Sequence, residues 1–402
     1  MEFSEYIEKF YNSENKDRFY SPSKIHWGIG IARDLAILLR NKRITFFIDT
    51  SIVENSVVQL LVNNSLSSSN VIQIHSPPSP EKIKNIVHGG DLIADIVVAI
   101  GGGSTIDTAK CCIAEKYFGE FDGLNLNGKR PQVSQKKHKP YFIALPSTAG
   151  TGAETSRYYV TYRELDTYKV HGKSWLLTAD MVFLDPTIAK TAPSQVLIES
   201  AFDAFIHLSE SSFCMKEGNW VNNTICTACL SQLRAGLDDI FVDNELDQGL
   251  LKLLCAASFA GVAISNVRTG HIHEMSGAFL EKTGLTHPQS LAVFWLDAFR
   301  HINNNELGHT KIQHVCKAFG SKSFDELEIF WQRLFEIHGV SKKISDRLSA
   351  FKSQDFINIE KAVIRRTLED SVWVTKECPV PLDEDIISEI FQNALARILT
   401  AE

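Results

Sequence analysis

ADIVVAIGGGSTIDTAK, residues 94–110, decides the fold of this chain. The apolar, β-branched run at its start is typical of a strand that is buried on both faces. Three glycines follow directly, and residues 104–118 then have the pattern of a helix. A glycine turn between strand and helix lets the backbone approach a pyrophosphate, and the free N–H groups of the new helix face the anion. The stretch therefore predicts a phosphate-binding unit in which Ser104 can cap the helix, and the alternative is that the three glycines form only a tight turn.

The neighbouring segments extend the same alternation of strands and helices. Three more strand-like runs occur: ITFFID (44–49), VIQIH (71–75) and PYFIALPST (140–148). Strands that alternate with helices form a parallel sheet with right-handed crossovers. From about Pro193 the pattern changes to long amphipathic helices. We predict an α/β N-terminal domain with a parallel Rossmann-like sheet, residues 1–188, and an all-α C-terminal domain, residues 189–402.

The composition restricts the class of protein. The chain has 402 residues, and 41 Lys and Arg against 48 Asp and Glu give a formal net charge of −7. This balance argues against a nucleic-acid-binding protein, which normally carries a basic face. The apolar runs fall short of the ~20 residues of a membrane span, and the acidic N-terminus is unlike a secretory signal. We expect a cytoplasmic protein that acts on a small molecule, without nucleic-acid or membrane partners.

Two further features concern a dinucleotide. Asp49 ends the strand at 44–49, where a carboxylate can accept both ribose hydroxyls of NAD and repel the 2′-phosphate of NADP. The alternative is that Asp49 only caps the turn that follows it. A second glycine loop, PSTAGTGAETS (146–156), ends the strand that begins near Tyr141, and its hydroxyls suit a ribose or a nicotinamide amide. The pattern favours NAD(H) over NADP(H).

A third group of candidate residues lies in the predicted all-α domain. Asp203 and His207 are four residues apart in a predicted helix, so they share one helical face. His273 and His287 follow along the chain. One carboxylate and three imidazoles form a ligand set that Zn²⁺ or Fe²⁺ accepts. His271, two residues from His273, points in a different direction on a helix and is not counted as a ligand.

With these motifs in order, the chain resembles the iron-containing alcohol dehydrogenase family, whose relatives include glycerol dehydrogenase and dehydroquinate synthase. The resemblance runs from about Tyr20 to the C-terminus, and its motifs are GGGSTIDTAK, PSTAGTGAETSR, DPT, FDAFIH and the pair His273 and His287. It implies a metal-dependent oxidoreductase that moves hydride between a nicotinamide and a small alcohol or aldehyde. A homodimer is ordinary for this family.

The resemblance also assigns roles to residues of this chain. The metal ligands, and with them catalysis, fall on Asp203, His207, His273 and His287. The pyrophosphate loop falls on Gly102, Gly103, Ser104 and Thr105. Further cofactor contacts fall on Ser147, Thr148, Thr151 and Lys169. Asp49 matches the position associated with NAD.

The chain departs from the family pattern at two positions near the metal. Many members carry a histidine four residues after the third ligand, where this chain has Gly277, and the glycine after the last ligand is Pro288. Water, His271 or a cofactor ribose hydroxyl then remains as the proton source for aldehyde reduction.

The stretch AISNVRTGHIHEMS (263–276) is similar to the branch that contains phosphonoacetaldehyde reductases. Arg268 in this stretch can bind a phosphonate or carboxylate through paired N–H groups, and its alternative is a salt bridge or helix-end cap. Arg268 and His271 are therefore the candidate substrate residues. Two alternatives for the whole chain are a dehydroquinate synthase-like lyase and a non-catalytic scaffold that retains the fold.

Overall fold

The structure of the protein is a computed structural model, in which residues 19–92, 95–118, 139–163, 168–213, 219–370, 378 and 380–400 are described. The chain divides into two compact units. The first comprises Met1–Ala192 and Gly236–Ser265, and the second comprises Pro193–Ala235 and Asn266–Glu402. An α/β unit with a parallel sheet and a helical unit confirm the predicted fold class.

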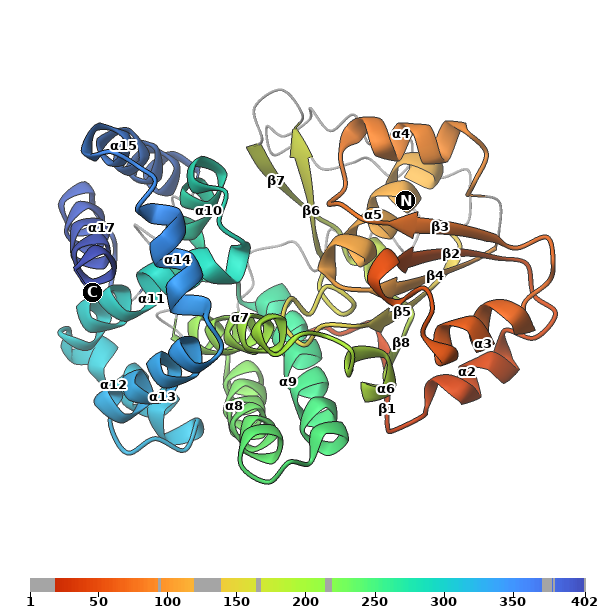
Figure 1. Ribbon diagram of the computed structural model, residues 1–402, viewed down its shortest axis with the longest axis horizontal. Coiled ribbons are helices and arrows are strands. Elements are labelled where there is room, and N and C mark those ends of the chain that lie inside the picture. Colours follow the sequence, from red (N-terminus) through yellow and green to blue (C-terminus); the bar gives the residue numbers. More distant parts are fainter. Residues whose placement is uncertain are drawn as a thin grey trace. The chain divides into compact units, whose positions relative to one another are not determined.

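The first unit is built on a six-stranded parallel sheet with the order β1-β8-β5-β4-β2-β3 (Figure 1). Its strands are β1 (Lys24–Trp27), β2 (Ile44–Asp49), β3 (Asn70–Ile74), β4 (Ile96–Gly101), β5 (Tyr141–Pro146) and β8 (Met181–Leu184). The register pairs Ile48 with Ile100 and Gly101 with Pro146, so β2, β4 and β5 end side by side. A two-stranded antiparallel sheet of β6 (Tyr158–Arg163) and β7 (Tyr168–Lys173) follows.

Helices cover both faces of the large sheet (Figure 1). One face packs α2 (Ala32–Leu38), α3 (Ser56–Asn64) and α6 (Pro186–Ala189) against alternate residues of the strands, such as Phe46 and Ile48 of β2. The other face carries α4 (Pro80–His88) and α5 (Gly103–Ile113). Both faces of β2 and β4 are therefore buried, as their unbroken apolar runs predict. Short helical turns complete the unit: η1 (Thr50–Ile52), η2 (Ala114–Phe118) and η3 (Trp175–Leu177).

The helix α9 (Leu246–Asn266) belongs to the first unit up to Ser265, although it follows α7 (Ser194–Phe213) and α8 (Trp220–Phe241) in the chain. Thr155 Oγ1 donates a hydrogen bond to the Ser258 carbonyl at 2.5 Å, and Ser258 Oγ donates to Glu154 Oε1 at 2.5 Å. The glycine loop after β5 is thus bonded to α9. The predicted division into residues 1–188 and 189–402 places all of α9 in the C-terminal domain, whereas the structure places α9 up to Ser265 in the first unit.

The helix α9 is also more apolar than we expect from the sequence. By length and composition alone α9 qualifies as a membrane span, and 72% of its apolar window is buried inside the structure. Its apolar composition is accounted for by this burial, which is usual for a core helix.

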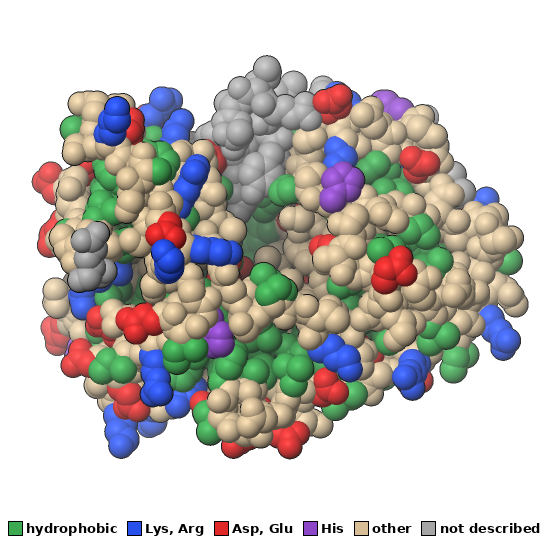
Figure 2. All heavy atoms as spheres, in the orientation of Figure 1, with side chains coloured by type: hydrophobic (Ala, Val, Ile, Leu, Met, Phe, Trp, Pro, Cys, Tyr) green, Lys and Arg blue, Asp and Glu red, His purple; other side chains and the backbone are tan. Residues whose placement is uncertain are grey.

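On the face of the molecule seen in Figure 2, Lys and Arg side chains are interspersed with Asp and Glu.

The second unit consists of helices around an aromatic core. Besides α8 up to Ala235 it contains α7, α10 (His271–Thr283), α11 (His287–Asn303), α12 (Glu306–Ala318), α13 (Phe324–Ile337), α14 (Val340–Leu348), α15 (Ser353–Asp370) and α17 (Glu384–Leu399). Phe202 of α7 packs edge-on against Trp295 and Trp331, with ring centroids 5.6 and 5.0 Å apart. Nearly every residue of α7 from Leu197 to Phe213 is buried. This packing fixes the rotation of α7, and hence the direction of its polar side chains.

Candidate active site

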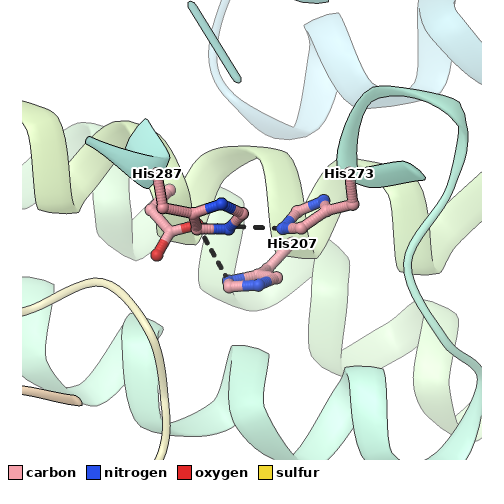
Figure 3. A group of neighbouring side chains, drawn as sticks. His207, His273 and His287 are labelled. Atoms are coloured by element: carbon pink, nitrogen blue, oxygen red, sulfur yellow. Dashed lines mark ion pairs between the residues drawn. The ribbon is translucent and has the colours of Figure 1, made fainter. Parts of the chain in front are cut away.

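The four predicted metal ligands come together within the second unit. Asp203 and His207 lie on α7, His273 is the third residue of α10, and His287 is the first residue of α11. One ligand atom from each of the four lies within 4.8 Å of the others. In Figure 3 the three imidazole rings point toward one another from three different helices.

Asp203 Oδ1 is at the centre of this group. It lies 3.6 Å from His207 Nδ1, 3.8 Å from His273 Nε2 and 3.6 Å from His287 Nε2. Donor atoms around a tetrahedral metal with bonds of about 2.1 Å are about 3.4 Å apart. Among the described residues, neither Asp203 Oδ1 nor His273 Nε2 has a hydrogen-bond partner, and both atoms are buried. Buried polar atoms without partners are rare, so the arrangement fits a divalent cation.

The electrostatics of the site agree with a metal. Burial by itself raises the pKa of the Asp203 carboxyl, but the adjacent imidazoles, His207 first, lower that pKa well below its ordinary value. The group is therefore an ionised carboxylate at neutral pH, which is the form that binds a cation.

Glu210 is a buried residue beside the metal ligands that is not predicted from the sequence. Its side chain is fully buried, and Oε2 accepts hydrogen bonds from His273 Nδ1 at 2.5 Å and from the Gly270 N–H at 2.8 Å. Oε1 accepts from the Ile272 N–H at 2.7 Å. Because His273 donates from Nδ1, its Nε2 is left to face Asp203. Burial lowers the pKa of His273, but Glu210 and Asp203 outweigh it and raise that pKa to about 9.

The residues predicted to bind a dinucleotide gather in the first unit, where β2, β4 and β5 end. A Cβ added to Gly102 would lie 3.3 Å from Thr148 Oγ1, and one on Gly103 would lie 2.9 Å from Thr151 Cγ2. The Ser147 N–H donates to the Gly101 carbonyl at 3.0 Å. The two glycine loops are thus in contact at the carboxyl edge of the sheet, where open α/β sheets bind ligands.

Ser104 and Lys169 are two further residues predicted for this region. The prediction that Ser104 caps the helix is wrong: Gly102 occupies the N-cap of α5, no side chain caps it, and Ser104 lies exposed in the first turn. Thr105 beside it is buried. Lys169 lies on β7, and its side chain is outside the described part of the chain.

Asp49 has the capping contact that was given as its alternative. Its Oδ1 accepts from the Ser51 N–H at 2.9 Å and from Ser51 Oγ at 2.7 Å, at the start of η1. Asp49 also lines a cavity of about 190 Å³, together with Thr50, residues 74–77, Ser104 and Thr105. One carboxylate oxygen is used by the turn, and the same residue borders the cavity beside the start of α5.

Comparison with known proteins assigns the family. The family model described as iron-containing alcohol dehydrogenase matches residues 22–186, and the C-terminal model of the Fe-containing alcohol dehydrogenase family matches residues 197–393. The chain belongs to the iron-containing alcohol dehydrogenase family. It is an oxidoreductase with an Asp and His metal site, and the dehydrogenase alternative is favoured over the lyase and the scaffold.

Individual relatives are distant. The dehydrogenase is 26% identical to 4-hydroxybutyrate dehydrogenase of Clostridium kluyveri over 64% of this chain and 70% of the relative. It is 23% identical to sulfoacetaldehyde reductase of Bilophila wadsworthia over 71% of this chain and 76% of the relative. The solved structure of an iron-containing alcohol dehydrogenase from Thermococcus thioreducens has the same fold, with a TM-score of 0.80, 22% identity, and coverage of 96% of this chain and 100% of the other.

Both departures of the dehydrogenase from the family pattern have a structural explanation. A Cβ added to Gly277 would lie 3.4 Å from Cζ of Arg366, whose guanidinium pairs with Glu281 at 2.5 Å. The guanidinium therefore fills the space beside Gly277. Pro288 is the second residue of α11, where the missing N–H has no intrahelical partner to lose.

Of the two candidate substrate residues, Arg268 lies just before α10 and His271 is the first residue of that helix. Arg268 is half-buried, has a φ of 112°, and accepts a hydrogen bond from Ser211 Oγ at its carbonyl. His271 is fully buried, and its Nε2 lies 2.6 Å from the Val380 carbonyl. Burial lowers the pKa of His271. Its ring is thus directed at the Val380 backbone, and it is not one of the four clustered ligands.

Proposed function

We propose that this dehydrogenase interconverts a small aldehyde that carries an anionic group with the corresponding alcohol, using NAD(H) and Fe²⁺ or Zn²⁺. The observation that carries the proposal is the convergence of Asp203, His207, His273 and His287 on one buried space. A divalent cation in this space supplies Lewis acidity toward the substrate oxygen. The nicotinamide carries the hydride, and the chain supplies binding and orientation.

The preference for NAD(H) over NADP(H) rests on Asp49. Its carboxylate borders the cavity at the carboxyl ends of β2 and β3, next to the start of α5. A negative charge at that place disfavours a second negative charge on the ribose. The resemblance of the chain to the family supports a cytoplasmic homodimer as part of this proposal.

The anionic substrate is supported by two observations. The names of two relatives, 4-hydroxybutyrate dehydrogenase and sulfoacetaldehyde reductase, specify substrates with a carboxylate and a sulfonate. Arg268 stands between α9 and the helix that carries His273. A guanidinium binds carboxylate, sulfonate and phosphonate groups through paired N–H donors, so phosphonoacetaldehyde belongs to the same class.

A matched aldehyde screen tests the proposal. NADH and NADPH oxidation are measured with butanal and with 4-oxobutanoate, which differ by the terminal charge, and then with sulfoacetaldehyde and phosphonoacetaldehyde. We expect a higher kcat/KM for NADH and for the anionic member, and loss of the anionic preference alone in Arg268→Ala. Equal use of butanal and 4-oxobutanoate would overturn the substrate class. An Asp203→Ala variant that still bound the metal and remained active would overturn the assignment of Asp203 as a metal ligand.

A further inference from the structure

We propose that α7 positions all four metal ligands, because Glu199 and Glu210 fix the helix starts that carry His287 and His273. The inference rests on the metal centre on which the proposed function depends. Glu199, Asp203, His207 and Glu210 follow one another at spacings of four, four and three residues, which places them along one face of the helix. Their exposed fractions are 8%, 1%, 5% and 0%. Two of the four are ligands, and the other two are buried carboxylates that bond to other helices.

Glu199 is bonded to the first turn of α11. Its Oε1 accepts from Gln289 Nε2 at 2.9 Å, and its Oε2 accepts from Thr286 Oγ1 at 3.2 Å. Thr286 is the N-cap of α11, and Thr286 and Gln289 bond to each other as a capping box. His287 is the residue that this box encloses. Gln195, one turn earlier on α7, donates to the same Oε1 at 2.6 Å. The start of α11 is therefore tied to α7 one turn before Asp203.

Glu210 is bonded to the first turn of α10. Both of its oxygens accept hydrogen bonds, from the backbone N–H groups of Gly270 and Ile272 and from the ring of His273. Gly270 is the N-cap of α10, so this carboxylate replaces the side-chain cap that the helix lacks. The same bonds fix the position of the helix start and the tautomer of the ligand.

The two carboxylates respond differently to an amide substitution. Thr286 Oγ1 can either donate or accept, so Glu199→Gln keeps all three contacts. The three groups that face Glu210 all donate, so Glu210→Gln sets an amide N–H against a donor. His273 can accept from that amide only if its proton moves to Nε2, the atom that faces Asp203 and would hold the metal. Position, rather than negative charge, is the property of Glu199 that matters for the metal.

Co²⁺ binding to the metal-free full-length protein tests the inference. We expect Glu199→Ala and Glu210→Gln to weaken Co²⁺ affinity by about 10- to 100-fold and to change the visible absorption of bound Co²⁺. Glu199→Gln is expected to retain the affinity and spectrum of the unmodified protein. The matched control is Glu360→Ala, which removes bonds from Ser388 Oγ at 2.6 Å and Gln392 Nε2 at 2.8 Å between α15 and α17. This control should lower thermal stability and leave Co²⁺ affinity unchanged.

Several outcomes would overturn the inference. Unmodified affinity and spectrum in Glu199→Ala would show that Glu199 is merely structural, and the same result in Glu210→Gln would remove Glu210. A loss in Glu199→Gln as large as in Glu199→Ala would show that charge is required. Should Glu199→Ala fail to fold, Gln289→Ala removes one of the two bonds between Glu199 and the start of α11 and should also weaken Co²⁺ binding. Failure of the unmodified protein to bind Co²⁺ would overturn the proposed function too, whereas normal binding in all variants overturns only the positioning.

Discussion

At position 277 a missing side chain leaves space for a charged group from another helix. The side chains of Arg366 and Glu281 are only 13% and 7% exposed, so this ion pair is largely desolvated. We expect Gly277→His, which restores the residue common in the family, to displace the guanidinium. Separating the partners of a buried ion pair costs about 3–5 kcal/mol, so the free energy of unfolding measured in urea should fall by about that amount.

Gly277→Ala is the control for this substitution. Its Cβ meets Arg366 Cζ at 3.4 Å, an ordinary contact, and alanine favours the helix by about 1 kcal/mol relative to glycine. The free energy of unfolding of this variant should be unchanged or slightly higher. If Gly277→His is as stable as the unmodified protein, Arg366 does not depend on the space at this position.

Some residues of the metal site could be recognised from the sequence, and others could not. Asp203 and His207 were recognisable because carboxylate and imidazole at a spacing of four share a helical face. Glu199 and Glu210 lie on that same face, but a glutamate on a helix is ordinarily a solvated residue, and only the structure shows them buried. The contact of Gly277 with Arg366 joins distant parts of the chain and has no local signal.

At the scale of elements, the first turn of α11 explains how a proline can follow a metal ligand. Pro288 is the second residue of the helix, and Thr286 caps the turn. We expect Pro288→Gly to lower the free energy of unfolding by about 0.4–1 kcal/mol, because the unfolded chain gains conformational freedom. Bound metal should remain stoichiometric, because the capping box and Glu199 still hold His287. Thermal unfolding with metal analysis checks both; loss of metal in this variant would mean that the proline ring itself shapes the site.

Elements were predictable where the pattern is local. The strands β2, β4 and β5 lie within two residues of the segments that the sequence indicated, because their apolar runs and breakers are adjacent in the chain. β1 and β8 have four residues each, too few to show a period, and β1 is largely exposed at the sheet edge. The helix predicted over 104–118 ends at Ile113, where a wider turn, η2, begins.

At the scale of the whole molecule, the order of the chain does not give the order of the units. Residues 236–265 return to the first unit through bonds such as Thr155 to Ser258, which join segments far apart in the sequence. The sequence of an apolar helix like α9 does not show in which hydrophobic core the helix will be buried. The fold class could be predicted from the alternation of strands and helices. The assignment of α9 to the first unit could be made only from its contacts in the structure.

This division makes the two ligand sites separable. The four clustered Asp and His residues all lie in the second unit, and the residues predicted to bind the dinucleotide all lie in the first: Asp49, Gly102, Gly103, Thr148 and Thr151. Chelating the metal should therefore abolish turnover while the dissociation constant for NADH, measured by fluorescence titration, stays unchanged. A ligand at 100 times its dissociation constant stabilises the folded protein by about 2.7 kcal/mol. Removing the metal by chelation should therefore lower the midpoint temperature of thermal unfolding. Asp203→Ala should reproduce both results without chelator, and loss of NADH binding on chelation would contradict the assignment of each site to one unit.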